Sequence, residues 1–201
     1  MSPKKVNKRS AKVTRTTKET DIKVELTIEG KGMSSVRTGI PFMDHMLTLM
    51  AAHGFFDLNV TAKGDVEVDD HHTVEDIGMV LGESFNEALG DRKGMKRYGR
   101  GLIPMDEALS SVVIDFSNRP LLVYHVNLKR DTTGRFDAQV IEEFFRAFVS
   151  RSGATLHINL MYGDNTHHII EAMFKAFGQA LDEATSIDNR ITKVRSTKGI
   201  L

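Results

Sequence analysis

Two segments of this 201-residue chain carry the same run of imidazole and carboxylate side chains. One runs from His71 to Glu75 and the other from His167 to Glu171, and each reads His-His-x-x-Glu. On a helix, the glutamate lies one turn beyond both histidines, so that imidazole and carboxylate groups can converge and bind a metal ion. Adjacent histidines point about 100° apart on a helix. Each pair therefore suggests ligands to two ions rather than to one.

The repeat extends upstream of these motifs, which indicates that the chain consists of two similar halves. The segment from Phe42 to His53 corresponds to the segment from Val140 to Arg151, and this correspondence sets His45 opposite Glu143. We therefore expect two equivalent half-sites, one in each half of the chain. The expected metal ligands are His45, His71, His72 and Glu75 in the first half-site, and Glu143, His167, His168 and Glu171 in the second.

The chain contains no cysteine, which excludes disulfides, thiolate metal sites and a cysteine nucleophile. A lone His-His pair is more often a surface or core feature than a metal ligand. Here the same polar signature occurs in both halves, although most of the polar residues around it differ. Imidazole and carboxylate ligands without sulfur suit manganese, iron or zinc. His125 and His157 have no such repeated partner, and we expect them to be structural.

Hydrophobic periodicity predicts the elements that position these residues. Apolar side chains recur at helical spacing after each motif, and alternating strands precede it, so each half reads strand, strand, helix, strand, helix. The sequence therefore predicts an α+β fold of two internally duplicated half-domains, each a small sheet with helices on one face, with the helices packed between the two sheets. The predicted helices begin near residues 42, 71, 140 and 167, and the predicted strands are 24–28, 35–38, 58–62, 112–116, 121–128 and 156–160.

Charge is unevenly distributed, although 27 basic and 27 acidic residues give a formal net charge of zero. The first 18 residues are basic and contain no acid, which is more typical of a solvated terminus than of a nucleic-acid site. No stretch is long and apolar enough for a membrane helix, and no secretory signal is recognisable, so we expect a cytoplasmic protein. We expect a flexible tail at 1–14, a first repeat at 15–95, a second repeat at 96–190 and a C-terminal tail at 191–201, with 15–201 forming one domain.

Further short segments accompany the two motifs in a fixed order. They are Arg15 to Thr20, Pro41 to Met46, His53 to Leu58, Asp70 to Asp76, Ala88 to Gly94, Pro104 to Ala108, Asp115 to Pro120, His167 to Ala172 and Ser196 to Gly199. In this order they resemble the imidazoleglycerol-phosphate dehydratase family, and the resemblance covers nearly the whole chain, from about Arg15 to Leu201.

The resemblance implies a duplicated fold of the ribosomal protein S5 domain 2-like kind and assembly into a homo-oligomer of 24 subunits. It implies active sites at subunit contacts, each holding two manganese ions. It also implies the reaction, in which D-erythro-imidazole glycerol phosphate loses water to give imidazole acetol phosphate in histidine biosynthesis. Several relatives carry histidine where this chain has Glu143, and a carboxylate can replace imidazole at manganese.

This reaction explains the need for metal, because the proton removed sits on a carbon with no neighbouring carbonyl. A metal bound to the substrate imidazole would favour the imidazolate, whose electrons help to expel the hydroxyl group. The resemblance implies Glu19, Glu171 and His72 as catalytic residues, with Glu19 as an acid/base. The resemblance also implies that the C-terminal tail orders over the bound substrate. The residues that it implies as phosphate ligands are Arg97, Arg119, Lys175, Ser196, Thr197 and Lys198. The remaining expected substrate contacts are His45, His53, His71, Glu75, His167 and His168.

The residues alone are also compatible with two other functions. A dinuclear metal-dependent phosphoester hydrolase would use the same ligands but would release phosphate. A non-catalytic metal-binding shell would use the same histidines and would leave the phosphate-binding residues unexplained. Turnover and the identity of the product distinguish these functions from the dehydratase.

Overall fold

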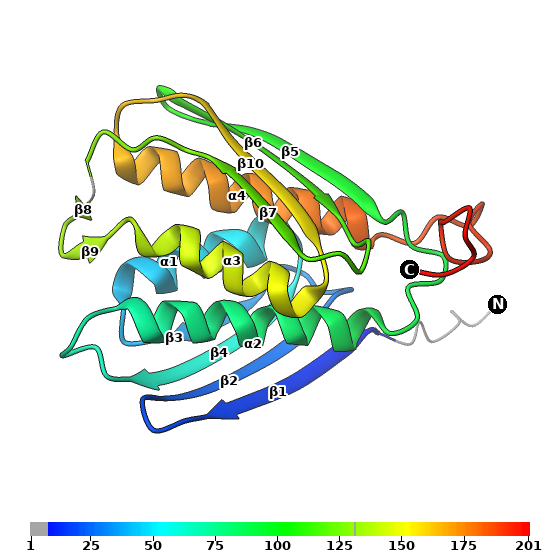
Figure 1. The fold of residues 1–201 in the computed structure, drawn as a ribbon, viewed down its shortest axis with the longest axis horizontal. Helices are drawn as coiled ribbons and strands as arrows, with labels where there is room; N and C mark the ends of the chain where they lie inside the picture. Colours follow the sequence, from blue (N-terminus) through cyan, green and yellow to red (C-terminus); the bar gives the residue numbers. More distant parts are fainter. Residues whose placement is uncertain (1–7, 131) are drawn as a thin grey trace.

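The computed structural model describes residues 8–130 and 132–201. Two four-stranded sheets enclose four helices (Figure 1). This arrangement confirms the predicted fold class. The first sheet contains, in spatial order, β1 (Ser10–Thr16), β2 (Thr20–Thr27), β4 (Asp57–Gly64) and β3 (Ser34–Arg37). The second sheet contains β5 (Tyr98–Met105), β6 (Ala108–Asp115), β10 (Thr155–Tyr162) and β7 (Leu121–His125).

The two sheets have the same topology, as expected for a duplicated chain. In each sheet three strands are antiparallel neighbours and the last edge strand is parallel, with β3 beside β4 and β7 beside β10. Among the described residues, no helix combines the length and the apolar character required to cross a membrane. The helices are α1 (Pro41–His53), α2 (His71–Leu89), α3 (Val140–Ser152) and α4 (Thr166–Thr185), and a hairpin of β8 (Thr132–Thr133) and β9 (Phe136–Asp137) precedes α3.

Each half begins with an edge strand that the sequence did not predict, β1 or β5. The prediction of a flexible tail is wrong for residues 10–14, because they pair with β2 along their whole length. Backbone hydrogen bonding holds this strand more than burial does, since Val13 is its one buried side chain. Residues 1–7 of the expected tail lie outside the described residues. The strand β7 ends at His125 rather than at residue 128.

One hydrophobic core joins the two halves. Alternation along β2 buries Ile22 and Val24 beneath α2. Phe85 of α2 contacts Phe56 at 5.2 Å between ring centroids, and it also contacts Phe148 of α3 at 5.7 Å. The second of these edge-to-face contacts crosses the boundary between the halves. The two repeats are therefore packed around shared side chains.

The helices of the two halves are exchanged across this core. The helix α3 packs against α2, and α1 packs against α4 (Figure 1). Glycines let the helix backbones approach closely. A Cβ atom on Gly82 of α2 would lie 2.4 Å from the carbonyl oxygen of Phe148, and one on Gly178 of α4 would lie 2.4 Å from that of Met50. Each His-His-x-x-Glu helix is thereby held against a helix from the other half.

Replacement of Gly82 by leucine should lower the free energy of unfolding by about 3 kcal/mol, because the side chain would force α2 away from α3. Urea denaturation followed by circular dichroism measures this change. Glu87→Leu, at an exposed position of the same helix, is the matched control and should change stability by less than about 0.5 kcal/mol. Unchanged stability of Gly82→Leu would contradict the close packing.

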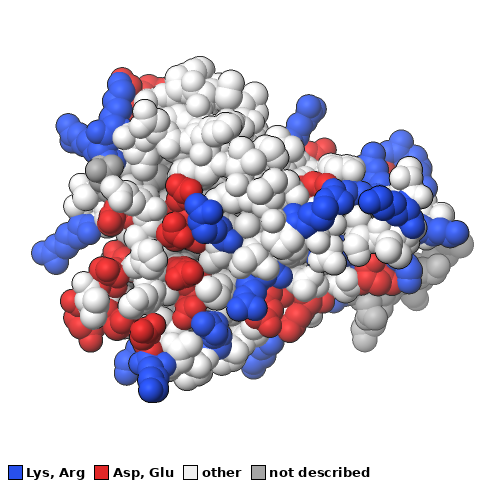
Figure 2. Space-filling view, viewed as in Figure 1, with Lys and Arg blue, Asp and Glu red and all other residues white. Residues whose placement is uncertain are grey.

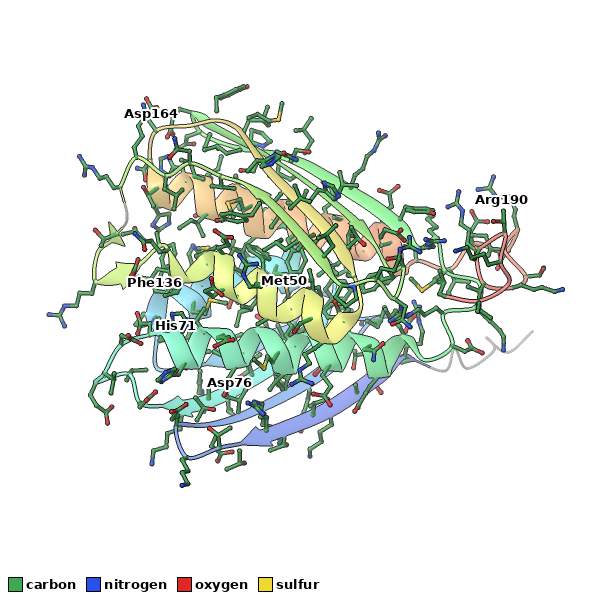
Figure 3. The ribbon with its side chains drawn as sticks, viewed as in Figure 1. Met50, His71, Asp76, Phe136, Asp164 and Arg190 are labelled. Atoms are coloured by element: carbon green, nitrogen blue, oxygen red, sulfur yellow. The ribbon has the colours of Figure 1, made fainter. Side chains whose placement is uncertain are left out.

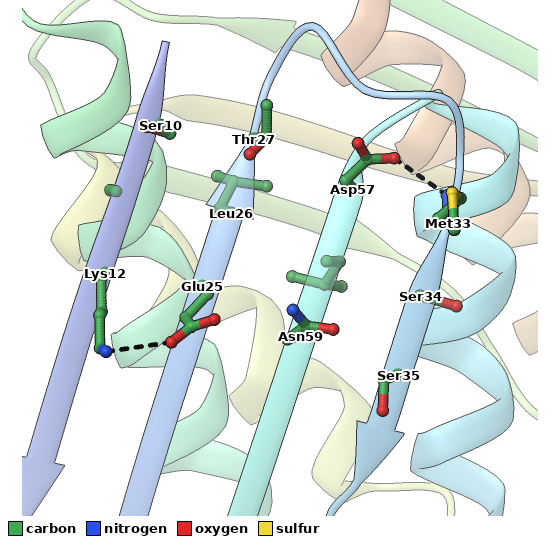
Figure 4. Close-up of a pocket in the computed structure, with 12 residues that line it drawn as sticks. Ser10, Lys12, Glu25, Leu26, Thr27, Met33, Ser34, Ser35, Asp57 and Asn59 are labelled. Atoms are coloured by element: carbon green, nitrogen blue, oxygen red, sulfur yellow. Dashed lines mark hydrogen bonds and ion pairs between the residues drawn. The ribbon is translucent and has the colours of Figure 1, made fainter. Parts of the chain in front are cut away.

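The outer faces of the two sheets differ in polarity. On the first sheet, Lys12, Glu25 and Asn59 surround an open cavity of about 710 Å³ (Figure 4). On the second sheet large apolar side chains are exposed, and the middle of the upper surface in Figure 2 is almost free of charge. An exposed apolar face is typical of a surface that another chain covers. The large apolar side chains exposed on it include those of Tyr98, Leu102, Val113, Leu121 and Met161.

Candidate active site

Three predicted metal ligands meet where α1 contacts α4. The ligand atoms of His45, His167 and Glu171 all lie within 4.8 Å of one another. Glu171 Oε2 is 3.2 Å from His167 Nε2 and 3.4 Å from His45 Nε2, so one cation at their centre would contact all three residues. Within residues 8–130 and 132–201, this is the one group of three such ligands. We call it the α1–α4 cluster.

Lys175 lies one turn beyond Glu171 on α4, and its Nζ is 2.6 Å from Glu171 Oε1. Burial alone would raise the pKa of Glu171, but the hydrogen bond and charge of Lys175, together with His45, lower it below its ordinary value. Glu171 is therefore ionised at neutral pH, as a metal ligand must be. The same helical spacing that the sequence predicted brings the lysine into this cluster.

The equivalent residues of the other helix pair are more open. His71 Nε2 and Glu75 Oε2 of α2 are 3.9 Å apart. His71 also lines a cavity of about 450 Å³ together with Glu143 of α3. Glu143 Oε2 lies 3.5 Å from Arg146 Nε, on its own helix. His71 and Glu143 share this cavity, but with Glu75 they do not close into a compact group.

The ligands are grouped differently from the two half-sites that the sequence predicted. We expected His45 beside the motif of its own half, and Glu143 beside the second motif. Because the helices are exchanged across the core, His45 instead joins Glu171, and Glu143 shares a cavity with His71. Each group therefore combines residues from both halves of the chain.

The second histidine of the first motif contacts acidic residues near the first sheet. His72 Nδ1 is 3.0 Å from Asp65 Oδ2 and 3.9 Å from Glu19 Oε2. The hydrogen bond with Asp65 and then the charge of Glu19 raise the pKa of His72. With Nδ1 held by a carboxylate, Nε2 remains to face a metal ion, an arrangement common to metal-binding histidines.

The second motif repeats this arrangement with a different acid. His168 Nδ1 lies 2.7 Å from Glu107 Oε2, and His168 Nε2 lies 3.7 Å from Asp106 Oδ2. The hydrogen bond raises the pKa of His168 and lowers that of Glu107 to about 2. Asp65, Asp106 and Glu107 were not predicted as site residues. A signal for Glu107 was available, because aligning the strand 24–28 with the strand 112–116 also sets Glu19 opposite Glu107.

The predicted phosphate-binding residues, except Lys175, line one cavity of about 830 Å³ at the C-terminal tail. Lys and Arg side chains gather around this tail at the right of Figure 2. Arg97 is buried and its Nε lies 2.6 Å from Asp115 Oδ1, while its Nη1 donates to the carbonyl oxygen of Arg195. Arg97 thus holds the tail in place. The predicted residues in this basic cavity are Arg97, Arg119, Ser196, Thr197 and Lys198.

The basic cavity and the α1–α4 cluster lie at opposite ends of α4. The backbone N–H of Arg97 donates to Ala184 near the end of this helix, whereas Glu171 lies near its start. A helix rises about 1.5 Å per residue, so roughly 20 Å separates the two sites along its axis. In Figure 3, Asp164 before α4 and Arg190 after it lie at opposite ends of the molecule.

Two further predicted substrate contacts lie beside the α1–α4 cluster. Lys175 pairs with Glu171 there and is absent from the residues that line the basic cavity. His53 ends α1 near Lys175, and partial burial together with that cation lowers its pKa. The structure therefore separates the predicted substrate-binding residues into two groups.

A family model described as imidazoleglycerol-phosphate dehydratase matches residues 38–181 of the chain. Proteins of that name from Trichlorobacter lovleyi and Geobacter sulfurreducens are 57% and 56% identical, covering 96% of this chain and 100% and 99% of their own. Solved structures of the Staphylococcus aureus and Pyrococcus furiosus enzymes of that name are 42% and 40% identical, with TM-scores of 0.81 and 0.83. They cover 89% and 94% of this chain and 99% and 100% of theirs. The chain therefore belongs to the imidazoleglycerol-phosphate dehydratase family.

Proposed function

We propose that this chain carries out its family's reaction in the cytoplasm. Each active site holds two manganese ions and is formed by two or more copies of the chain. As a family member it is a hydro-lyase of histidine biosynthesis, which converts D-erythro-imidazole glycerol phosphate to imidazole acetol phosphate. The family is metal-dependent and oligomeric. The observation that carries the proposal is the separation, within one chain, of the histidine clusters from the basic cavity.

A substrate held by its phosphate in the basic cavity has its imidazole ring far from the α1–α4 cluster of the same chain. The separation of roughly 20 Å along α4 exceeds the length of so small a molecule. Contact between copies removes this difficulty, because the cavity of one copy then faces a histidine cluster of another. The exposed apolar face of the second sheet supports such assembly. We propose a homo-oligomer of 24 copies.

The available ligands fit manganese, because they offer imidazole nitrogen and carboxylate oxygen without sulfur. When bound, the metal acts as a Lewis acid that favours the anionic form of the substrate imidazole. Asp65 and Glu107 hold Nδ1 of His72 and His168, which leaves Nε2 of each ring to face an ion. The proposed ligands are His45, His71, His72, Glu75, Glu143, His167, His168 and Glu171.

The remaining residues bind the substrate or move protons. Glu19 lies in the exposed turn between β1 and β2, and its side chain is 59% exposed, so it can reach a substrate as acid or base. Arg119 is also exposed and can donate two parallel hydrogen bonds to a phosphate. Arg97 holds the tail that carries Ser196, Thr197 and Lys198 to the same phosphate. Lys175 lowers the pKa of Glu171 and so keeps its carboxylate charged. His53 lies near Lys175 as a further substrate contact.

Metal-stripped protein should form imidazole acetol phosphate only after manganese is added, with a rate increase of at least about 100-fold. The assay follows conversion of imidazole glycerol phosphate with and without Mn²⁺. A His72→Ala, His168→Ala double variant removes one proposed ligand from each motif and should lose this response, while circular dichroism confirms its fold. Release of inorganic phosphate would support a hydrolase instead. Absence of turnover by folded, manganese-loaded protein would leave a metal-binding shell.

A further inference from the structure

Asp76 is a buried carboxylate with no place among the proposed ligands or substrate contacts. It follows Glu75 on α2, and 8% of the residue is exposed (Figure 3). Its Oδ2 accepts a hydrogen bond from Thr20 Oγ1 at 2.5 Å, and its Oδ1 accepts one from Arg15 Nε at 3.0 Å. A carboxylate is buried in this way only when charged or polar donors compensate its lost hydration. Asp76 therefore connects α2 firmly to the first sheet.

Its two partners flank the turn that carries Glu19. Arg15 lies near the end of β1 and Thr20 starts β2. Within the turn, Thr17 Oγ1 accepts hydrogen bonds from the backbone N–H groups of Glu19 at 3.1 Å and Thr20 at 3.0 Å. The turn is thus braced internally, and Asp76 fixes both of its ends to the helix.

This helix also carries His72, whose Nδ1 lies 3.9 Å from the Glu19 carboxylate. The position of Glu19 relative to the His-His-x-x-Glu motif is therefore set by the hydrogen bonds that Thr20 and Arg15 donate to Asp76. Among residues 8–130 and 132–201, no group donates a hydrogen bond to the Glu19 carboxylate, so its position depends on the turn rather than on its own contacts.

The other half of the chain lacks this arrangement. Ala172 and Ala108 occupy the positions that correspond to Asp76 and Thr20. There the turn is held by Glu107 itself, whose carboxylate accepts hydrogen bonds from the backbone N–H of Asn165 at 2.8 Å and pairs with His168 at 2.7 Å. Glu107 serves as a structural anchor. In the first half Asp76 takes over the anchoring, and Glu19 is left free for chemistry.

We infer that Asp76 is a positioning residue that acts through Thr20 and Arg15 to hold Glu19 at the substrate. The inference rests on the proposed role of Glu19 in proton transfer. An acid or base displaced by about 1 Å loses roughly 100-fold in rate. Asp76→Asn and Thr20→Val should therefore lower kcat about 10- to 100-fold, with KM within about 3-fold of wild type. Manganese binding should be unchanged, because both substitutions leave every proposed ligand in place.

The test is a double-mutant cycle with Glu19→Gln, measured as kcat on manganese-loaded protein of confirmed fold and assembly size. If Asp76 acts through Glu19, adding Asp76→Asn to Glu19→Gln lowers kcat no further. Thr20→Val provides the same test should Asp76→Asn fold poorly, and Thr20→Ser, which keeps the hydroxyl group, should retain wild-type kcat. Asp57→Asn is the structural control: Asp57 accepts two backbone hydrogen bonds in another turn of the first sheet (Figure 4), and its loss should leave kcat unchanged.

The possible outcomes separate this inference from the function on which it rests. If Glu19→Gln lowers kcat but Asp76→Asn and Thr20→Val do not, or if the effects multiply, the positioning role is overturned and the role of Glu19 stands. If Glu19→Gln has wild-type kcat, the proposed role of Glu19 fails and the inference fails with it. Loss of manganese binding in Asp76→Asn would assign the residue to the metal site and would equally overturn positioning.

Discussion

Substitution of Glu171 by glutamine should lower kcat/KM by about 1000-fold or more. Glu171 Oε2 lies within 3.4 Å of both His45 and His167, so a cation in the α1–α4 cluster needs its charge. Glutamine has almost the same shape but is neutral, and its amide nitrogen repels a cation. The substitution also leaves the Lys175 ammonium beside the site without its counter-ion. Steady-state kinetics and equilibrium binding of Mn²⁺ measure the two losses.

The matched control for this prediction is Glu183→Gln. Glu183 lies on the same helix and accepts a hydrogen bond from the backbone N–H of Arg100, outside the cluster. The substitution is chemically identical, so kcat/KM should stay within about 3-fold of wild type. Wild-type manganese affinity and turnover in Glu171→Gln would show that the α1–α4 cluster is not a metal site.

The fold was predictable from sequence where side-chain pattern and burial agree. The helix α2 and the strand β2 bury the apolar faces that their periodicity indicates. The strand β5 was missed because its inward positions include Gly99 and Gly101, which leave no apolar alternation to detect. Glycine is required there, since a Cβ atom would lie 1.9 Å from the carbonyl oxygen of Ala180 or 2.2 Å from that of Ala176.

The site was predictable residue by residue but not as an assembly of residues. The repeated motif identified His167 and Glu171. The alignment of the two halves upstream of the motif identified His45. Nothing in the sequence indicated that α1 would cross to the helix of the other half, because that exchange depends on close helix contacts such as Gly178 against Met50. The acids that hold the second histidines were missed for a related reason. Asp65 lies seven residues before His72, in the loop that leads into α2, where helical spacing does not apply.

Two inactive variants should restore activity when they are assembled together. A His167→Ala, Glu171→Gln variant loses the α1–α4 cluster and keeps the basic cavity, whereas an Arg119→Ala, Lys198→Ala variant loses the cavity and keeps the cluster. Alone, each should be about 1000-fold less active, because each loses either a metal site or two charged contacts to phosphate. Co-expression with two affinity tags, followed by tandem purification, yields assemblies that contain both chains.

If each active site takes its cluster from one copy and its cavity from another, random mixing leaves about a quarter of the sites with both parts intact. The mixed assembly should therefore recover about a quarter of wild-type kcat. A site contained within one chain predicts no recovery, since every chain in the mixture carries one defect. The matched control combines His167→Ala chains with Glu171→Gln chains: both defects then lie in the same cluster, no exchange of partners can complete a site, and activity should stay at background. Recovery in the first mixture but not in the second would place the two halves of each active site on different subunits.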